Sequence, residues 1–185
     1  MKKGAYILLL LANGLLMFVL VNSIKTQIEV NEQTSRLEAK IKGKLLFIRD
    51  LQKVYQSQFG IYAQTWEELE EYASNGNIYT IQKSEKHKFD PAANREISSL
   101  TYDTLNSISV LDSIFKSSNY NPEELGKVPG FDGKNFVITT NKINYGTTEI
   151  ETIQVQCPAI TNPKTRNKKL QIGSLNRPTL AGNWN

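Results

Sequence analysis

One continuous helical pattern covers residues 1–59, which contain no proline. Residues 5–21 (AYILLLLANGLLMFVLV) carry no charge, and residues 25–36 are polar on nearly every side. From there apolar residues recur every three or four positions, the spacing of one helix face. The pattern predicts a long helix whose stem, residues 25–59, starts to contact the rest of the chain at Leu37. The residues of this face are Leu37, Ile41, Leu45, Ile48, Leu51 or Gln52, Tyr55 and Phe59.

A coiled coil is the alternative for the stem. Coiled coils need apolar residues at two positions of each heptad, sustained over several heptads. Upstream of Leu37 such positions do not persist for three heptads. The pattern therefore favours a solvated or partner-packed stem.

The uncharged segment predicts a membrane anchor, residues 1–24. Its seventeen helical residues span ~26 Å, just short of a hydrocarbon core of about 30 Å, and Gly4 with residues 22–24 closes the gap. A cleaved signal peptide is the alternative, with Val21 and Ser23 at its small-residue positions. Because Lys2 and Lys3 precede the segment, we expect one pass through the inner membrane, with the N-terminus cytoplasmic and the bulk of the chain periplasmic.

The stem is expected to end in an aromatic turn, residues 59–62 (FGIY), because glycine adopts the left-handed conformation that terminates helices. Residues 65–68 (TWEE) then form a capping box that starts a short second helix, which runs to about Ala73. Large aromatic side chains on both sides of the glycine predict a sealed junction between stem and head. The junction residues are Phe59, Gly60, Tyr62 and Trp66.

The remainder, residues 60–185, predicts a small head of mixed helix and strand. Alternation of apolar and polar residues, and enrichment in Val, Ile and Thr, indicate strands. The expected elements are a strand at 78–82, a polar loop at 84–95, a strand followed by a turn of helix at 107–115, a short helix at 121–125, two hairpin strands at 135–142 and 148–157, and an irregular tail at 174–185. The fold class is α+β: an N-terminal transmembrane helix continues into the stem and packs on a small antiparallel sheet.

Few residues are suited to catalysis. The chain has one cysteine, Cys157, and one histidine, His87, which excludes an internal disulfide and a Cys/His zinc cluster. No phosphate-binding or dinucleotide-binding glycine motif occurs. We expect Cys157 to be a buried thiol and His87 to be a solvated loop residue. The sequence thus predicts a protein that is not an enzyme, with no catalytic residues, no metal, no cofactor and no small-molecule substrate.

Charge adds one local feature. The net charge of +4 is modest and gives no argument for nucleic acid. From Thr152 to Asn185, however, there is no acidic residue, while Lys164, Arg166, Lys168 and Lys169 are basic. Such a stretch suits lipid headgroups or an acidic protein surface. A solvated loop is the alternative.

The N-terminal half resembles type IV pilins and type II secretion pseudopilins. The shared features are the apolar helix with its amphipathic extension, the pattern Leu-x-x-Ile-Arg-x-Leu-Gln-x-x-Tyr at 45–55, and the turn at 59–62. Residues 2–4 (KKG) are similar to a prepilin cleavage site. The acidic residue that the family places five positions after that site is replaced by Leu9, a loss that only minor, tip-type pseudopilins tolerate. The resemblance implies that the helix end packs on a sheet and that the aromatics close the junction.

A second resemblance covers more of the chain. Residues 48–83, 108–120, 125–130 and 172–185 look like a family of uncharacterised single-anchor envelope proteins from Bacteroidota. The ending GNWN is similar to the family's GNWP. This resemblance implies an architecture and a compartment but no mechanism.

Together these features predict a membrane-anchored structural subunit of an envelope-spanning or pseudopilus-like assembly. The alternative is a stand-alone periplasmic binding or adaptor module tethered to the inner membrane. The expected partners are the bilayer, through residues 5–24, and other envelope subunits, through the face Leu37, Ile41 and Leu45 and the basic residues Lys164, Arg166, Lys168 and Lys169.

Overall fold

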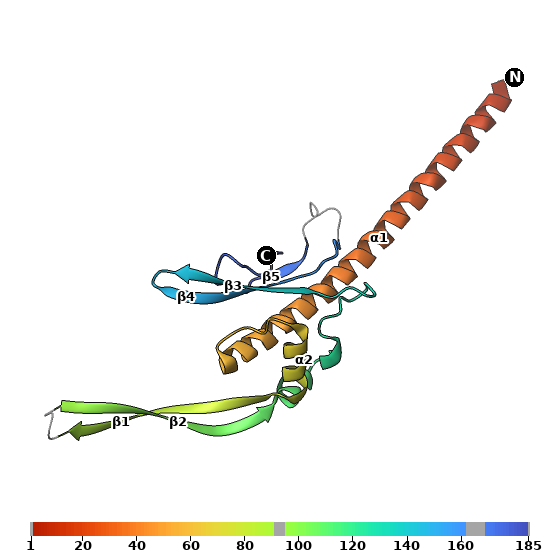
Figure 1. Cartoon of the computed structure of the whole chain (residues 1–185). Helices are drawn as coiled ribbons and strands as arrows, with labels where there is room; N and C mark the ends of the chain where they lie inside the picture. Colours follow the sequence, from red (N-terminus) through yellow and green to blue (C-terminus); the bar gives the residue numbers. More distant parts are fainter. Residues whose placement is uncertain (1, 91–94, 162–168, 185) are drawn as a thin grey trace.

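The computed structural model describes residues 2–90, 95–161 and 169–184; the side chains of 2, 3, 5–10, 12, 86–90 and 95–99 are not described. The fold is α+β, as expected: one long N-terminal helix and two small antiparallel sheets (Figure 1). The elements in chain order are α1 (Lys2–Phe59), α2 (Trp66–Asn75), β1 (Asn77–Asp90), β2 (Arg95–Ser109), η1 (Leu111–Phe115), η2 (Pro122–Glu124), β3 (Val137–Tyr145), β4 (Thr148–Gln156) and β5 (Gln171–Gly173).

Helix α1 confirms the predicted continuous helix. Its second half lies between the three-stranded sheet on one side and α2 on the other, and its first half projects away from the rest of the molecule (Figure 1). The predicted apolar face is the buried one, with Ile41, Leu45 and Ile48 fully covered. The helix ends at Phe59 because Gly60, at φ 77°, takes the left-handed conformation. In the part of the chain that the structure describes, no helix has a stretch long and apolar enough to span a membrane.

Helix α2 begins at the predicted capping box. The Thr65 side chain accepts a hydrogen bond from the Glu68 backbone N–H, and the Glu68 carboxylate accepts one from the Thr65 N–H. Leu69 and Tyr72 face the core. A Cβ on Gly76, the C-terminal cap, would lie 2.3 Å from the Tyr72 carbonyl oxygen. Only glycine therefore lets the chain turn this closely against Tyr72.

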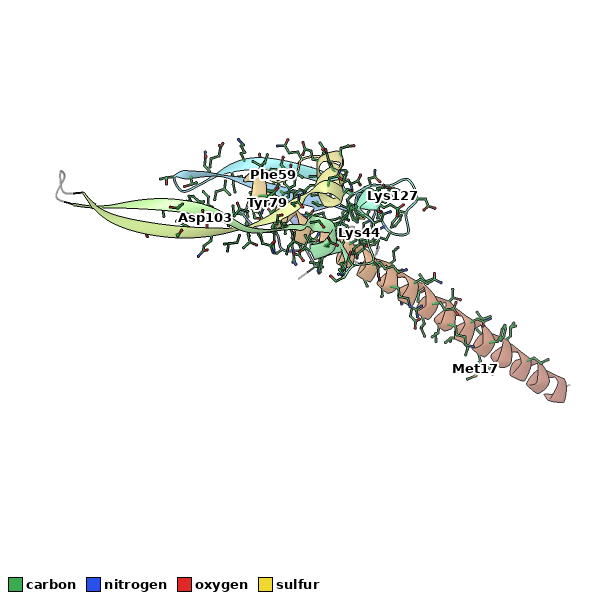
Figure 2. The ribbon with its side chains drawn as sticks, turned by 90° about the horizontal axis from the view of Figure 1, so that it is seen from below. Met17, Lys44, Phe59, Tyr79, Asp103 and Lys127 are labelled. Carbon is green, nitrogen blue, oxygen red and sulfur yellow. The ribbon has the colours of Figure 1, made fainter. Side chains whose placement is uncertain are left out.

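Strands β1 and β2 form a long two-stranded ribbon that extends away from the head, opposite to the free end of α1 (Figures 1 and 2). The predicted polar loop at 84–95 is wrong, because residues 84–90 continue β1 and residue 95 begins β2. Side chains on both faces of this ribbon are mostly exposed along residues 79–85 and 100–108. Since neither face is buried, the sequence has no reason to alternate apolar and polar residues there.

The second sheet has the order β3-β4-β5. Strands β3 and β4 are the predicted hairpin, closed by a turn with Gly146 at φ 66°. Strand β5 was not predicted, since it has three residues and pairs only with the end of β4. The C-terminal segment continues the sheet through a bridge between Ile172 and Gly182. Part of the expected irregular tail is thus fixed to the sheet edge.

The core lies where α1, α2 and the second sheet meet. Its largest fully buried side chains include Phe136, Ile41, Leu45, Leu69 and Ile172. Cys157 is also fully buried, as expected, and burial raises the pKa of its thiol. The short helical turn η2 starts at the predicted proline, with Asn121 capping it.

Candidate functional site

The free N-terminal end of α1 contains a segment that is apolar on all sides. Residues 15–21 are seven consecutive large apolar residues, and every one is exposed. Seven consecutive residues cover the whole circumference of a helix, at 3.6 residues per turn. A helix that is apolar all round is normally buried in a large core or a membrane. Nothing in the described part of this chain covers residues 15–21.

The polar middle of α1, residues 25–36, is stabilised by contacts within the helix itself. Arg36 and Glu32 form an exposed ion pair at 3.5 Å, and just beyond this segment Lys42 pairs with Glu38 at the same distance, as the i, i+4 spacing predicts. Thr26 and Thr34 donate hydrogen bonds to carbonyls one turn back. This middle therefore behaves as a solvated spacer between the apolar end and the head.

The connection between α1 and α2 is held by side chains on three elements. The Gln52 side-chain amide exchanges two hydrogen bonds with the Ala63 backbone, at 3.0 and 3.1 Å. The Glu151 carboxylate on β4 accepts a hydrogen bond from the Tyr62 N–H at 2.8 Å. The Trp66 indole donates to the Phe136 carbonyl at 2.8 Å. The segment after the helix is thus bonded to the helix and to the sheet.

Lys44 is a buried cation on α1. Its ammonium group donates hydrogen bonds to the backbone carbonyls of Glu124 at 2.5 Å and Lys127 at 2.7 Å. Burial lowers the pKa of Lys44, while the nearby Glu124 charge raises it. The signal was the spacing: Lys44 follows Ile41 by three positions and precedes Ile48 by four, which puts it on the core face. Lys44 therefore joins α1 to the end of η2.

The structure corrects the expected partner face on the stem. Ile41 and Leu45 are both 0% exposed, and Leu37 is half-buried against Gly130. The same periodicity that suggests a partner face describes the core face of the chain itself. These residues are not free to bind another subunit.

The junction residues occupy different environments. Gly60 ends the helix, Tyr62 is 7% exposed and Trp66 is half-buried. Phe59 is 57% exposed and so does not close the core, although its ring packs against Tyr72 with centroids 5.6 Å apart.

A groove of about 750 Å³ lies between α1, β4 and the C-terminal segment. Its charged side chains are Arg49, Lys53 and Glu151. Arg49 and Lys53 both pair with Asp50, at 2.9 and 3.6 Å, and Glu151 accepts the Tyr62 N–H. The charges that line the groove therefore have partners within the chain.

The remaining candidate residues are placed as follows. Lys164, Arg166 and Lys168 lie outside the described residues, and Lys169 is exposed beside them. His87 lies in β1 opposite Ser98, in a strand and not in the expected loop. Within residues 2–90, 95–161 and 169–184, no cluster of three His, Cys, Asp or Glu side chains is placed to hold a metal ion.

The chain has no recognisable relative in three comparisons. Family models, curated proteins and solved structures give no match. The function therefore has to be argued from the geometry of the chain itself.

Proposed function

We propose that this protein is a non-enzymatic, membrane-anchored structural subunit of an envelope-spanning or pseudopilus-like assembly. The supporting observation is the division of α1 into two halves: residues 37–55 are built into the head, and residues 15–21 are apolar, exposed and uncovered. One end of α1 belongs to the head, and the other end needs an apolar environment. The helix is therefore suited to attaching the head to a membrane. In this proposal the anchor crosses the inner membrane and the head is periplasmic.

The resemblance to pseudopilins adds a partner to this proposal. In that arrangement the apolar helix packs beside the helices of other subunits. Residues 15–21 replace Leu37, Ile41 and Leu45 as the expected contact, because the latter are used by the head. Leu9 stands where the pilin family has an acid, so we expect a minority subunit that joins other chains and does not polymerise alone.

Membrane attachment is tested by the substitution Leu16→Arg. A charge at the centre of an inserted helix costs ~2.5–3.5 kcal/mol, so we expect Leu16→Arg to shift the protein from the washed membrane fraction to the soluble fraction. Gln27→Arg, in the polar middle, is the matched control and should stay with the membrane. A wild-type chain found soluble and starting near Ile24 would support a cleaved signal peptide and contradict the anchor.

The assembly is tested by cysteine crosslinking. Leu15→Cys and Phe18→Cys, in a Cys157→Ala background, should crosslink in membranes to different proteins. Crosslinks only between copies of this chain would exclude the mixed assembly. The second candidate, a tethered binding module, is supported by the grooves of the head; it predicts no helix crosslinks while the head still binds a partner.

A further inference from the structure

Three aromatic rings gather where α1 ends beside α2. The ring centroids of Tyr55 and Phe59 lie 4.5 Å apart, those of Tyr55 and Tyr72 5.2 Å, and those of Phe59 and Tyr72 5.6 Å. The two pairs with Tyr72 are edge-to-face, at 88° and 80°. Two adjoining pockets, of about 290 and 600 Å³, open beside these rings and share Phe59 and Tyr72. The rings therefore line a recess at the head surface.

The rim of the smaller pocket is acidic. Glu68 and Glu71 line it together with the rings. The Glu68 carboxylate accepts the Thr65 N–H in the capping box and also the Gln64 N–H, the latter at 2.9 Å. Glu71 is exposed and makes no ion pair with any described residue of the chain. Burial raises the pKa of Tyr55, and the nearby charges of Glu68 and Glu71 raise it further.

The Tyr72 hydroxyl is the second observation that points to a ligand. Tyr72 is 7% exposed, and its hydroxyl oxygen is buried with no hydrogen-bond partner among the described residues. Buried polar atoms in native proteins are nearly always paired, so an unpaired one calls for an explanation. The recess thus combines aromatic rings, a carboxylate without a cation and an oxygen without a donor.

The larger pocket differs in chemistry. It is lined by Tyr79 and Ile81 of β1, both about half exposed, at the base of the β1–β2 ribbon. Phe59 and Tyr79 lie close together at this place (Figure 2). A side chain bound here would meet mainly apolar surface. The two pockets therefore form adjoining subsites, the smaller one suited to a cation and the larger one to an apolar group.

We propose that this recess binds a basic segment of a partner protein, with one Lys or Arg side chain against Tyr55, Phe59 and Glu71 and a neighbouring apolar side chain on Tyr79 and Ile81. A cation is attracted by aromatic rings and by the unpaired Glu71 charge. Its N–H groups supply the donor that the Tyr72 oxygen lacks among the described residues. The site belongs to the head alone, so it does not depend on how α1 is anchored.

The test uses two peptides that differ only in charge. The full chain, kept in solution with a non-ionic detergent and labelled at its tyrosine rings, is titrated with Ac-Gly-Lys-Ile-Gly-amide and with the Gln peptide Ac-Gly-Gln-Ile-Gly-amide. We expect the Lys peptide to shift the NMR signals of Tyr55 and Tyr72 and to bind about fivefold tighter than the Gln peptide. Equal affinity for the two peptides, or no shift with either, would overturn the proposal.

Matched variants separate the site from general charge attraction. Glu71→Gln should weaken binding of the Lys peptide by about three- to fivefold. Glu67→Gln, on the same helix but outside both pockets, should leave the affinity for this peptide unchanged. Phe59→Leu keeps an apolar side chain but removes the ring, and should also weaken binding of the Lys peptide. All three residues are exposed, so these variants should stay folded. Equal losses for Glu67→Gln and Glu71→Gln would exclude a specific site.

Discussion

Lys44 shows how one buried charge connects two distant parts of the chain. Its ammonium group donates hydrogen bonds to two backbone carbonyls that lie 80 and 83 positions away in the sequence. Lys44→Met keeps most of the side-chain volume but removes both donors. We expect a loss of ~1–3 kcal/mol in the free energy of unfolding, because buried carbonyls left without donors are costly.

The control for Lys44 is Lys40→Met, one turn earlier on the same helix, where the side chain is exposed. Urea unfolding of the two variants measures the difference. Equal stability of both variants would show that the carbonyls find other donors.

At Tyr72 we expect the opposite effect on stability. Because its hydroxyl has no hydrogen-bond partner among the described residues, Tyr72→Phe should remove a desolvated polar atom without breaking a hydrogen bond. We expect this variant to unfold at the same or a higher temperature than the wild type, and to bind the Lys peptide more weakly. Tyr62→Phe is the comparison, since the Tyr62 hydroxyl interacts with Gln56. A clear loss of stability in Tyr72→Phe would mean that the hydroxyl is paired in solution.

At the scale of elements, the end of α1 depends on Tyr62 more than on Phe59. Tyr62 is buried and its backbone N–H is bonded to β4, whereas more than half of Phe59 is exposed. Truncating a large buried aromatic costs about 3–5 kcal/mol, so Tyr62→Ala should lower the melting temperature strongly. Phe59→Ala should lower it much less. Similar shifts for the two variants would restore the prediction that both residues seal the junction.

The elements that could be predicted are those whose sequence pattern has a local cause. The unbroken period of α1, the capping box of α2 and the β-rich residues of β3 and β4 each specify an element within a short window. The strand at 78–82 was predicted and lies in β1, but the outer part of the β1–β2 ribbon was missed because its strands have no buried face to impose alternation. Strand β5 was missed because three residues carry too little pattern. The candidate recess could not be predicted either, since Tyr55, Tyr72 and Tyr79 come together only through the angle between α1 and α2.

At the scale of the whole molecule, burial of weak acids predicts sensitivity to alkaline pH. Burial raises the pKa of Tyr55, Tyr62, Tyr72 and Tyr120 above 10.0 and that of Cys157 above 9.0. The unfolded chain therefore loses these protons at lower pH than the folded chain does. The stabilisation is complete below the unfolded values and is lost as the pH rises through the folded ones.

Lys44 acts in the opposite direction, because its lowered pKa makes folding more favourable as the pH rises towards 10.5. The raised pKa values of the four tyrosines and Cys157 act against the effect of Lys44. We therefore expect the urea midpoint to fall as the pH rises from about 9 to 10.5. Cys157→Ala should remove the earliest part of the fall, and Tyr72→Phe a later part. A midpoint that stays constant over this range would contradict the prediction.

The unbroken course of α1 also sets the direction in which the head faces. Because the helix has no hinge between residues 21 and 37, every added residue turns the head by about 100° about the helix axis, and seven added residues turn it by only about −20° while moving it ~10 Å further out. Inserting one alanine after Gln33 should therefore point the recess away from a neighbouring subunit and abolish head-to-partner crosslinks, whereas a seven-residue helical insertion should largely preserve them. If both insertions act alike, the stem bends in the assembly. If they differ, the number of residues in the polar middle sets the direction in which the head faces. The length of this segment then matters more for assembly than which residues it contains.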